Sequence, residues 1–192
     1  GNGKTGASVF GGVEKDSIYL NDAPLWSGEP VNANMNPEAY RTIPEIRAAL
    51  AGGDYKLADE LQKKIQGKFS ESYAPLGTLV LDFGAAAKPA SYRRDLDISE
   101  AVSSVTYTLN GISYKREYFV SHPAGVLVIR ITSSQKGALN FSVRFGSKLR
   151  FKTSAAAGRL SVAGYAPVHA DPNYLGDRPN ALVFDEQRGT RF

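Results

Sequence analysis

The clearest candidates for chemistry in this chain are two carboxylates, Asp95 and Asp97. Hydrolysis of a glycosidic bond uses two carboxyl groups that flank the bond, roughly 5 to 10 Å apart. At positions i and i+2 of an extended segment, two side chains lie on the same face. Arg93 and Arg94 directly precede the pair, so we expect ion pairing or capping of a turn rather than catalysis.

Histidine and cysteine offer little further chemistry. The sequence has no cysteine, which excludes disulfides, thiol catalysis and cysteine zinc sites. His122 and His169 are the two histidines and lie far apart in the sequence, so no local metal-ligand spacing and no Ser-His-Asp arrangement can be proposed. We expect no cofactor and no metal. At His122, within Ser-His-Pro, we expect a hydrogen-bonded turn residue.

Aromatic loop residues are the candidates for ligand contacts. Trp26 is the single tryptophan, and it could stack on a sugar ring, although such a residue more often fills the core. Residues 164–174 form a long predicted loop that contains Tyr165, His169 and Tyr174. Long loops are often functional, but packing against another domain is an equal alternative. The four candidate sugar contacts are therefore Trp26, Tyr165, His169 and Tyr174.

The glycines at the start of the chain resemble a nucleotide-binding pattern, Gly1-x-Gly3-x-x-Gly6. That pattern requires a strand before it and a helix after it, because the helix N-terminus holds the phosphates. The residues after Gly6 are β-branched, aromatic and glycine-rich, which indicates a strand. We therefore expect these glycines to permit tight turns or close backbone approach.

Composition is that of one globular domain. The 192 residues are 42% hydrophobic and 22% charged, with 19 Gly and 10 Pro, which favours a turn-rich β fold. The net charge is +4, but the basic residues are spread among acids rather than clustered, so we expect no nucleic-acid partner. No apolar run reaches transmembrane length, and we expect no membrane partner.

Two short helices are predicted over about 43–67. Thr42 with Glu45 suggests a capping box, and Gly52-Gly53 ends the first helix. The second begins at Asp54 and ends at Gly67. Each helix carries a narrow apolar stripe that a neighbouring sheet would cover. The stripes consist of Ile43, Ile46 and Leu50, and of Leu57, Leu61 and Ile65.

The rest of the chain indicates strands. Asn110-Gly111 is the strongest hairpin signal and places Leu109 opposite Ile112 and Tyr107 opposite Tyr114. The largely apolar run 126–131 predicts a central buried strand. Other strands are predicted over 7–13 and 17–20, with a polar turn at 14–16 between them, and over 77–83, 138–145 with a continuation at 149–151, 159–162 and 181–184. A sequon at Asn140 falls within one of them.

These roughly nine strands predict a mainly β fold, a large antiparallel β-sandwich with a two-helix insertion. Residues 1–192 form a single predicted domain. The last residues, Gly189-Thr190-Arg191-Phe192, look like a strand that opens without a partner, from which we expect a domain truncated at its C-terminus.

Taken as a set, several motifs resemble the N-terminal domain of glycoside hydrolase family 95, the inverting α-L-fucosidases. They are Gly1-Asn2-Gly3 with Gly6-Ala7 and Phe10-Gly11-Gly12-Val13, Leu20-Asn21 with Leu25-Trp26-Ser27-Gly28, Tyr73-Ala74-Pro75-Leu76-Gly77 with Leu81-Asp82-Phe83, Tyr92-Arg93-Arg94-Asp95-Leu96-Asp97, Asp171-Pro172-Asn173-Tyr174, and Gly189-Thr190-Arg191-Phe192. They occur in the expected order. The chain departs from the commoner pattern at Asp22-Ala23-Pro24, where an acidic residue and Thr are more usual.

The resemblance implies a β-super-sandwich that precedes an (α/α)6 barrel. In that family the catalytic Glu, Asn and Asp residues belong to the barrel, so no catalytic residue is carried over to this chain. The family's domain continues beyond the position of Phe192, which again implies truncation. The resemblance also implies a periplasmic or secreted bacterial location; the sequence itself indicates no compartment.

Three functions follow as hypotheses. The first is a non-catalytic N-terminal domain of an α-L-fucosidase-like glycoside hydrolase, which supports the barrel of the same parent chain and lends a loop to the active-site rim. The parent would hydrolyse fucosylated glycans. The second is a stand-alone carbohydrate-binding module that binds a fucosylated oligosaccharide. The third is a scaffold whose loops serve only to pack on other domains.

Overall fold

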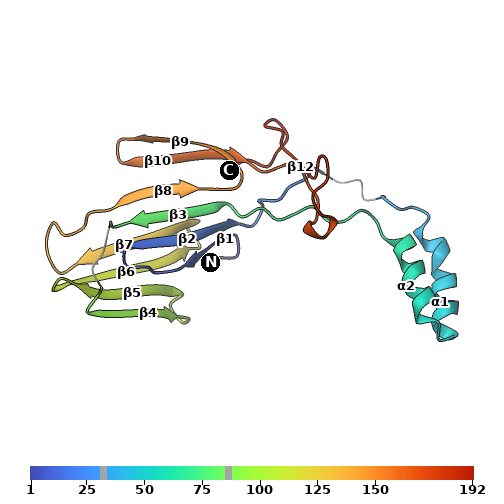
Figure 1. The fold of residues 1–192 in the computed structure, drawn as a ribbon, viewed down its shortest axis with the longest axis horizontal. Coiled ribbons are helices and arrows are strands. Elements are labelled where there is room, and N and C mark those ends of the chain that lie inside the picture. The colour runs from blue at the N-terminus through green and yellow to red at the C-terminus, as the bar shows by residue number, and fades with distance from the viewer. Residues whose placement is uncertain (31–33, 85–87) are drawn as a thin grey trace.

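Two four-stranded antiparallel sheets make up most of the chain in a computed structural model, which describes residues 1–30, 34–84 and 88–192 (Figure 1). The first sheet has the order β1-β2-β3-β8, with β1 Thr5–Val9, β2 Lys15–Asp22, β3 Gly77–Asp82 and β8 Ser142–Gly146. The second has the order β4-β5-β6-β7, with β4 Ser91–Asp97, β5 Val102–Leu109, β6 Ile112–Ser121 and β7 Val126–Ser133. The predicted fold class, antiparallel β with two helices, is confirmed.

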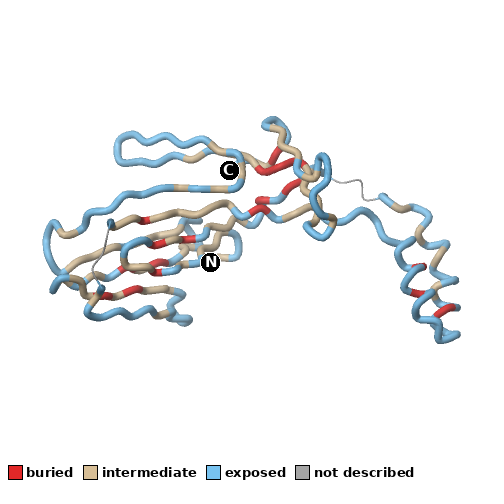
Figure 2. Tube along the Cα trace, viewed as in Figure 1, coloured by how far each residue is buried: buried red, intermediate tan, exposed pale blue. Residues whose placement is uncertain are grey.

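The main core lies between these two sheets. Alternate residues of the strands point inward, and the fully buried ones come from both sheets (Figure 2). They are Ile18, Leu81, Val105, Tyr107 and Tyr118. Burial of each large apolar side chain contributes about 1.5–3 kcal/mol, so this shared core holds the two sheets together as a sandwich.

The hairpin predicted at Asn110-Gly111 is confirmed. Both residues have positive φ, 51° and 77°, as a two-residue turn of the I′ type requires. Leu109 pairs with Ile112 and Tyr107 with Tyr114, in the predicted register. The Tyr107 and Tyr114 rings stack with centroids 5.0 Å apart.

Four strand predictions are wrong in detail. The run 126–131 forms β7 at an edge of its sheet, where its inward residues still pack on the core. The segment at 149–151 belongs not to β8 but to β9 Arg150–Ala156, which pairs with β10 Arg159–Tyr165. Asn140 lies just before β8 and is exposed. The terminal segment has a partner, because Arg191 bridges to Tyr165.

Shorter elements complete the described chain, which forms twelve strands where about nine were predicted. Within the predicted loop 164–174 lies β11 His169–Ala170, and the 3-10 turn η3 Asn173–Leu175 begins at its end. The partner of β11 is β12 Leu182–Val183, which confirms the strand predicted over 181–184. The segment 164–174 is therefore partly held by pairing.

The helices occur where they were predicted. They are η1 Ala39–Thr42, α1 Ile43–Ala51, α2 Tyr55–Gln62 and η2 Lys63–Ile65. Asp54 caps α2, since its side chain accepts a hydrogen bond from the Leu57 amide at 3.0 Å. The capping box at Thr42 is wrong: the 3-10 turn before α1 already gives Thr42 helical angles, and its side chain makes no cap bond.

The expected packing of these helices on a sheet is also wrong. The helices pack on each other through Ile46, Ala49, Ala58 and Leu61, and Figure 1 shows them lying apart from the sheets. Leu50 is consequently exposed. In the described part of the chain, neither helix has the length and apolar character needed to cross a membrane.

Candidate functional site

Two motifs quoted for the family lie side by side at one end of the sandwich. The backbone of Leu25–Ser27 runs antiparallel to Ser72–Ala74, with a bridge between Trp26 and Tyr73. The Ser27 amide donates to the Ser72 carbonyl at 2.8 Å, and the Ala74 amide donates to the Leu25 carbonyl at 2.9 Å. Residues 45 or more positions apart are thereby fixed next to each other.

A second small core lies beneath this junction. It consists of buried Leu25, Ala74 and Ala166, with Leu149 and Phe192 packed against it. The end of the chain joins it through backbone hydrogen bonds between Gly164 and Phe192, both 3.0 Å. Leu25, and not Trp26, is the residue that fills this core.

Trp26 itself points to the surface. It is 46% exposed, so the expectation of a core tryptophan is wrong. Its indole N–H donates to the Ala23 carbonyl at 3.1 Å, and its ring meets Tyr73 edge to face at 5.7 Å. Alternation along the short bridge explains this, because it turns Leu25 inward and Trp26 outward.

A charged cluster forms next to the junction around His169 of β11. The His169 Nδ1 lies 2.9 Å from Glu71 Oε1, and its Nε2 lies 3.1 Å from Asp171 Oδ1. Arg178 donates to Asp171 Oδ2 through its NH2 group at 2.6 Å. Ser27 Oγ donates to Glu71 Oε2 at 2.7 Å. The cluster thus ties together three segments that are distant in sequence, those around Ser27, Glu71 and residues 169–178.

The electrostatics favour the charged forms of these groups. The hydrogen bond with Glu71 raises the pKa of His169, and Asp171 adds to this effect. The hydrogen bond from Arg178 lowers the pKa of Asp171. Partial burial acts to raise the pKa of Glu71, but hydrogen bonds from Ser27, His169 and a backbone amide outweigh it and lower the pKa. An imidazolium between two carboxylates is therefore the stable arrangement.

This cluster lines a cleft of about 1060 Å³, at the upper end of the size of small-molecule sites. The cleft lies where the chain passes from the sandwich toward the helices. It is lined by Ser27, Glu29, Pro30, Met35, Lys68, Phe69, Ser70, Glu71, Val168, His169, Asp171, Arg178, Pro179, Asn180, Val183 and Arg188. The Phe69 and His169 rings are 6.0 Å apart. We take this cleft as the candidate site.

The four sequence-predicted contacts are not gathered in one cavity. His169 lines the cleft. Tyr165 lines a different cavity, of about 590 Å³, near Phe192. Tyr174 is 75% exposed on η3, and Trp26 lies outside both linings. Sequence reasoning missed Glu71, Phe69 and Arg178, because their partners lie 98 residues away or in loops without periodicity.

The carboxylate pair of β4 has the structural role that was expected. Asp95 pairs with Arg93 at 2.6 Å, and this hydrogen bond lowers its pKa. Asp97 accepts from the Ser99 and Glu100 amides in the next turn. His122 is exposed in the turn between β6 and β7.

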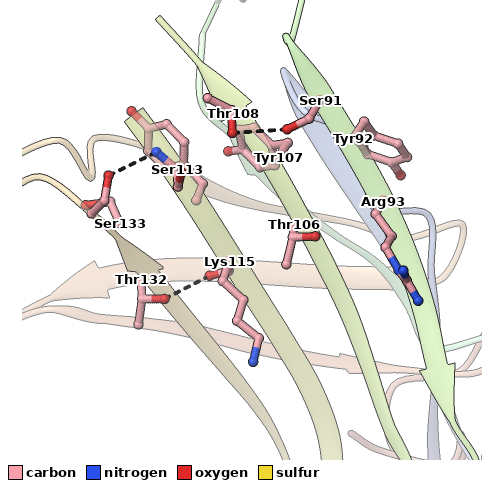
Figure 3. Close-up of a pocket in the computed structure, with 12 residues that line it drawn as sticks. Ser91, Tyr92, Arg93, Thr106, Tyr107, Thr108, Ser113, Lys115, Thr132 and Ser133 are labelled. Atoms are coloured by element: carbon pink, nitrogen blue, oxygen red, sulfur yellow. Dashed lines mark hydrogen bonds between the residues drawn. The ribbon is translucent and has the colours of Figure 1, made fainter. Parts of the chain in front are cut away.

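A second hollow, of about 430 Å³, lies over the sheet β4-β5-β6-β7 (Figure 3). Its hydroxyl groups bond to each other or to the backbone: Ser91 donates to Thr108 at 3.0 Å, and Thr132 donates to the Lys115 carbonyl. No acid and no histidine occurs among the residues that line it. The hollow therefore offers neither a carboxylate nor an imidazole to a ligand.

An ion pair is fully buried between the two sheets, and sequence reasoning missed it. Asp16 was predicted in a polar turn, but it lies in β2 with no exposed surface. Its Oδ2 accepts from Arg116 of β6 at 3.2 Å and also from the Tyr118 hydroxyl. Burial raises the pKa of Tyr118, and the hydrogen bond to Asp16 adds to the shift.

The glycine pair Gly11-Gly12 completes this ion pair. The Gly11 amide donates to Asp16 Oδ1 at 2.7 Å, and the Gly12 carbonyl accepts from Arg116 at 2.7 Å. A Cβ on Gly12 would lie 2.2 Å from the Lys15 carbonyl oxygen, so only glycine fits. The close backbone approach expected of Gly1, Gly3 and Gly6 occurs instead at Gly12, since the space around Gly3 and Gly6 is open. The segment around Gly6 is a strand and not a helix.

Among the described residues, no group of three or more His, Cys, Asp or Glu side chains is arranged to hold a metal ion. What the cleft offers instead is hydrogen bonding from fixed ion pairs beside an apolar wall. That combination suits recognition of a ligand and the positioning of segments.

The comparisons with known proteins all match the chain to glycoside hydrolases. Residues 1–190 match the family described as glycosyl hydrolase family 65, N-terminal domain. The whole chain is 31% identical over 199 residues to "Alpha-L-fucosidase 2" of Arabidopsis thaliana, of which it covers 24%. About 70% of the chain is 30% identical to "Probable alpha-fucosidase A" of Aspergillus niger, of which it covers 17%. The chain spans about a quarter or less of the length of these curated relatives.

Proposed function

Because this chain belongs to the glycosyl hydrolase N-terminal domains described under family 65 and is fucosidase-like, we propose that it is the non-catalytic N-terminal domain of an inverting α-L-fucosidase of family 95. In this proposal the parent chain also contains an (α/α)6 barrel that hydrolyses fucosylated glycans. The domain supports that barrel and contributes the cleft end of the sandwich to the rim of the active site.

The match of residues 1–190 to a glycosyl hydrolase N-terminal domain carries the proposal, and the state of the carboxyl groups agrees with a non-catalytic role. A glycosidase needs a carboxylic acid that keeps its proton until the leaving group takes it, which calls for a raised pKa. In the described ranges, six carboxyl groups have a pKa that is held below its ordinary value. They are Glu71, Asp82, Asp95, Asp97, Glu117 and Asp171. None of these groups is suited to be the general acid.

The exposed helical pair supports a role in domain packing. Leu50, Tyr55 and Leu57 are 48%, 72% and 43% exposed on α1 and α2. Apolar side chains gathered on one short helical hairpin mark an interaction surface. The barrel of the same parent chain is the partner that we propose for this surface.

The experiment compares this chain with its parent protein in hydrolysis of an aryl α-L-fucoside. We expect turnover by the parent protein and none by the 192-residue chain. Turnover that follows the chain through successive purification steps, and that is lost on Asp95→Asn or Asp97→Asn, would overturn the proposal. A parent protein in which Leu50→Asp leaves expression and thermal stability unchanged would argue against docking through the helices, with Lys56→Asp as the matched control.

A further inference from the structure

We infer that the cleft around His169 binds the ring of a neutral sugar. The volume of about 1060 Å³ is ample for more than one sugar ring. The site differs from the aromatic set predicted by the sequence, because it uses His169 but neither Trp26, Tyr165 nor Tyr174. Only the choice of a fucoside as the probe rests on the proposed function.

The charge balance of the cleft favours a neutral ligand. Its acidic side chains are already matched with cations: Asp171 with Arg178 and His169, Glu71 with His169, and Glu29 with Arg188. A phosphate or carboxylate that binds the arginines would have to displace these partners, which costs the energy of the existing ion pairs. Of the cations that line the cleft, Lys68 alone forms no ion pair with the described residues. A hydroxyl group can instead donate to a carboxylate or accept from a guanidinium without breaking either pair.

The apolar wall matches the other side of a sugar ring. Phe69 and Met35 line the cleft and are 37% and 43% exposed, respectively. The Phe69 ring lies beside His169, 6.0 Å between centroids, so the apolar face borders the polar cluster directly. A pyranose presents C–H groups on one face and hydroxyl groups around its edge, and aromatic rings commonly stack on that face.

Asn180 adds a neutral amide to the lining of the cleft. It lies in the lining of the cleft with φ 63°, a left-handed conformation that Asn tolerates. An amide both donates and accepts, as adjacent sugar hydroxyls require. Phe69 and Asn180 therefore supply one apolar and one polar group to the same cleft.

The test is a titration of the 192-residue chain with methyl α-L-fucopyranoside, followed by NMR shifts and calorimetry. Methyl α-D-glucopyranoside and inorganic phosphate are titrated in parallel. We expect saturable binding of a sugar with weak affinity, on the order of millimolar, because the cleft is open to solvent. Phosphate should neither saturate nor compete.

Two variants locate the site, and one serves as the matched control. Phe69→Ala should weaken binding by about three- to tenfold, the effect of losing one stacking ring. Asn180→Gly, which accepts the left-handed backbone, should weaken it several-fold. Trp26→Ala, an exposed aromatic outside the cleft, should leave affinity unchanged within about twofold. Thermal unfolding shows whether each variant is folded. If Phe69→Ala does not fold, Asn180→Gly still tests the site.

The outcomes separate the possibilities. Saturable binding of either sugar with loss in the two cleft variants supports the inference. No saturation by either sugar, competition by phosphate, or loss in Trp26→Ala alone would each overturn it. Binding without turnover leaves the proposed function intact, whereas turnover by the chain would contradict that function whatever the binding result.

Discussion

Removal of the buried carboxylate at Asp16 is the most severe single change that the structure predicts. Asp16 and Arg116 have no exposed surface, so Asp16→Ala leaves a guanidinium inside the sandwich without its counter-charge. It also leaves the Gly11 amide and the Tyr118 hydroxyl without their acceptor. Loss of one partner from a buried pair costs about 3–5 kcal/mol, against a total stability of about 5–15 kcal/mol for a domain.

The contacts of Arg116 show why the cost is high. Without Asp16 the guanidinium keeps one hydrogen bond, to the Gly12 carbonyl, and two ring contacts, at 4.7 Å from Phe83 and 5.2 Å from Tyr107. Its Nε already has no partner. Cation–π contacts contribute about 0.5–2 kcal/mol, which is too little to replace a carboxylate.

Urea unfolding measures the loss, with far-UV circular dichroism and the fluorescence of the single tryptophan as two probes. We expect Asp16→Ala to lower the free energy of unfolding by about 3–5 kcal/mol. A triple variant that makes the site apolar, Asp16→Leu with Arg116→Met and Tyr118→Phe, should recover at least half of that loss, because no charge then remains buried. Asp95→Ala, an exposed carboxylate, is the control and should leave the midpoint unchanged.

Two results would refute this reasoning. A loss below about 1 kcal/mol for Asp16→Ala would mean that water or a rearranged side chain compensates the charge. A triple variant as unstable as Asp16→Ala would mean that the ion pair itself, and not the unpaired charge, stabilises the fold.

Three further predictions concern the cleft end of the sandwich. Because the pKa of His169 is raised in the folded state, its ion pairs with Glu71 and Asp171 stabilise the fold below pH 6.5, its ordinary pKa, and this contribution is lost as pH rises through the folded-state pKa. His169→Gln should therefore flatten the decline of the thermal midpoint with rising pH. An unchanged pH profile would contradict a stabilising role for these ion pairs. In urea unfolding, Leu25→Ala should lower the free energy of unfolding by about 2–5 kcal/mol, and Trp26→Ala by about 1 kcal/mol. A larger loss for Trp26→Ala than for Leu25→Ala would mean that the tryptophan is the core residue. Gly164→Ala places a Cβ 2.4 Å from a carbonyl oxygen of β9 and should lower yield and stability, whereas Gly6→Ala, with open space around it, should be neutral in the same measurements.

Local signals in the sequence predicted the elements that local physics decides. Asn110-Gly111 specifies its own turn and register, since both residues accept positive φ. Asp54 caps α2 because an aspartate before a helix can reach the third amide after it. Thr42 satisfied the same pattern and failed, because the preceding 3-10 turn had already set its backbone. The immediate neighbours of a capping motif therefore decide whether it forms.

Long-range pairing is what the sequence could not reveal. Asp16 and Arg116 are 100 residues apart, and nothing in Glu14-Lys15-Asp16 distinguishes a turn acid from a buried one. The Glu71 contact with His169 likewise spans 98 residues. The run at 126–131 failed in another way: periodicity reports that both faces of a strand are apolar, but the position of that strand in the sheet depends on its partners.

Several residues of the motifs that resemble the family make packing or hydrogen-bond contacts within this domain. Gly11 and Gly12 enclose a buried arginine, Leu25 fills a core, and Ser27 holds Glu71. Few other residue types fit these positions, because a substitution that adds a Cβ, leaves a cavity or unpairs a buried charge would lower the free energy of unfolding by several kcal/mol. A pattern dominated by packing and pairing residues can identify a family without indicating its chemistry. The sugar proposed for the cleft is then selected by Phe69 and Asn180, which lie outside every one of those motifs. Variants at these two positions should change binding while leaving the fold intact.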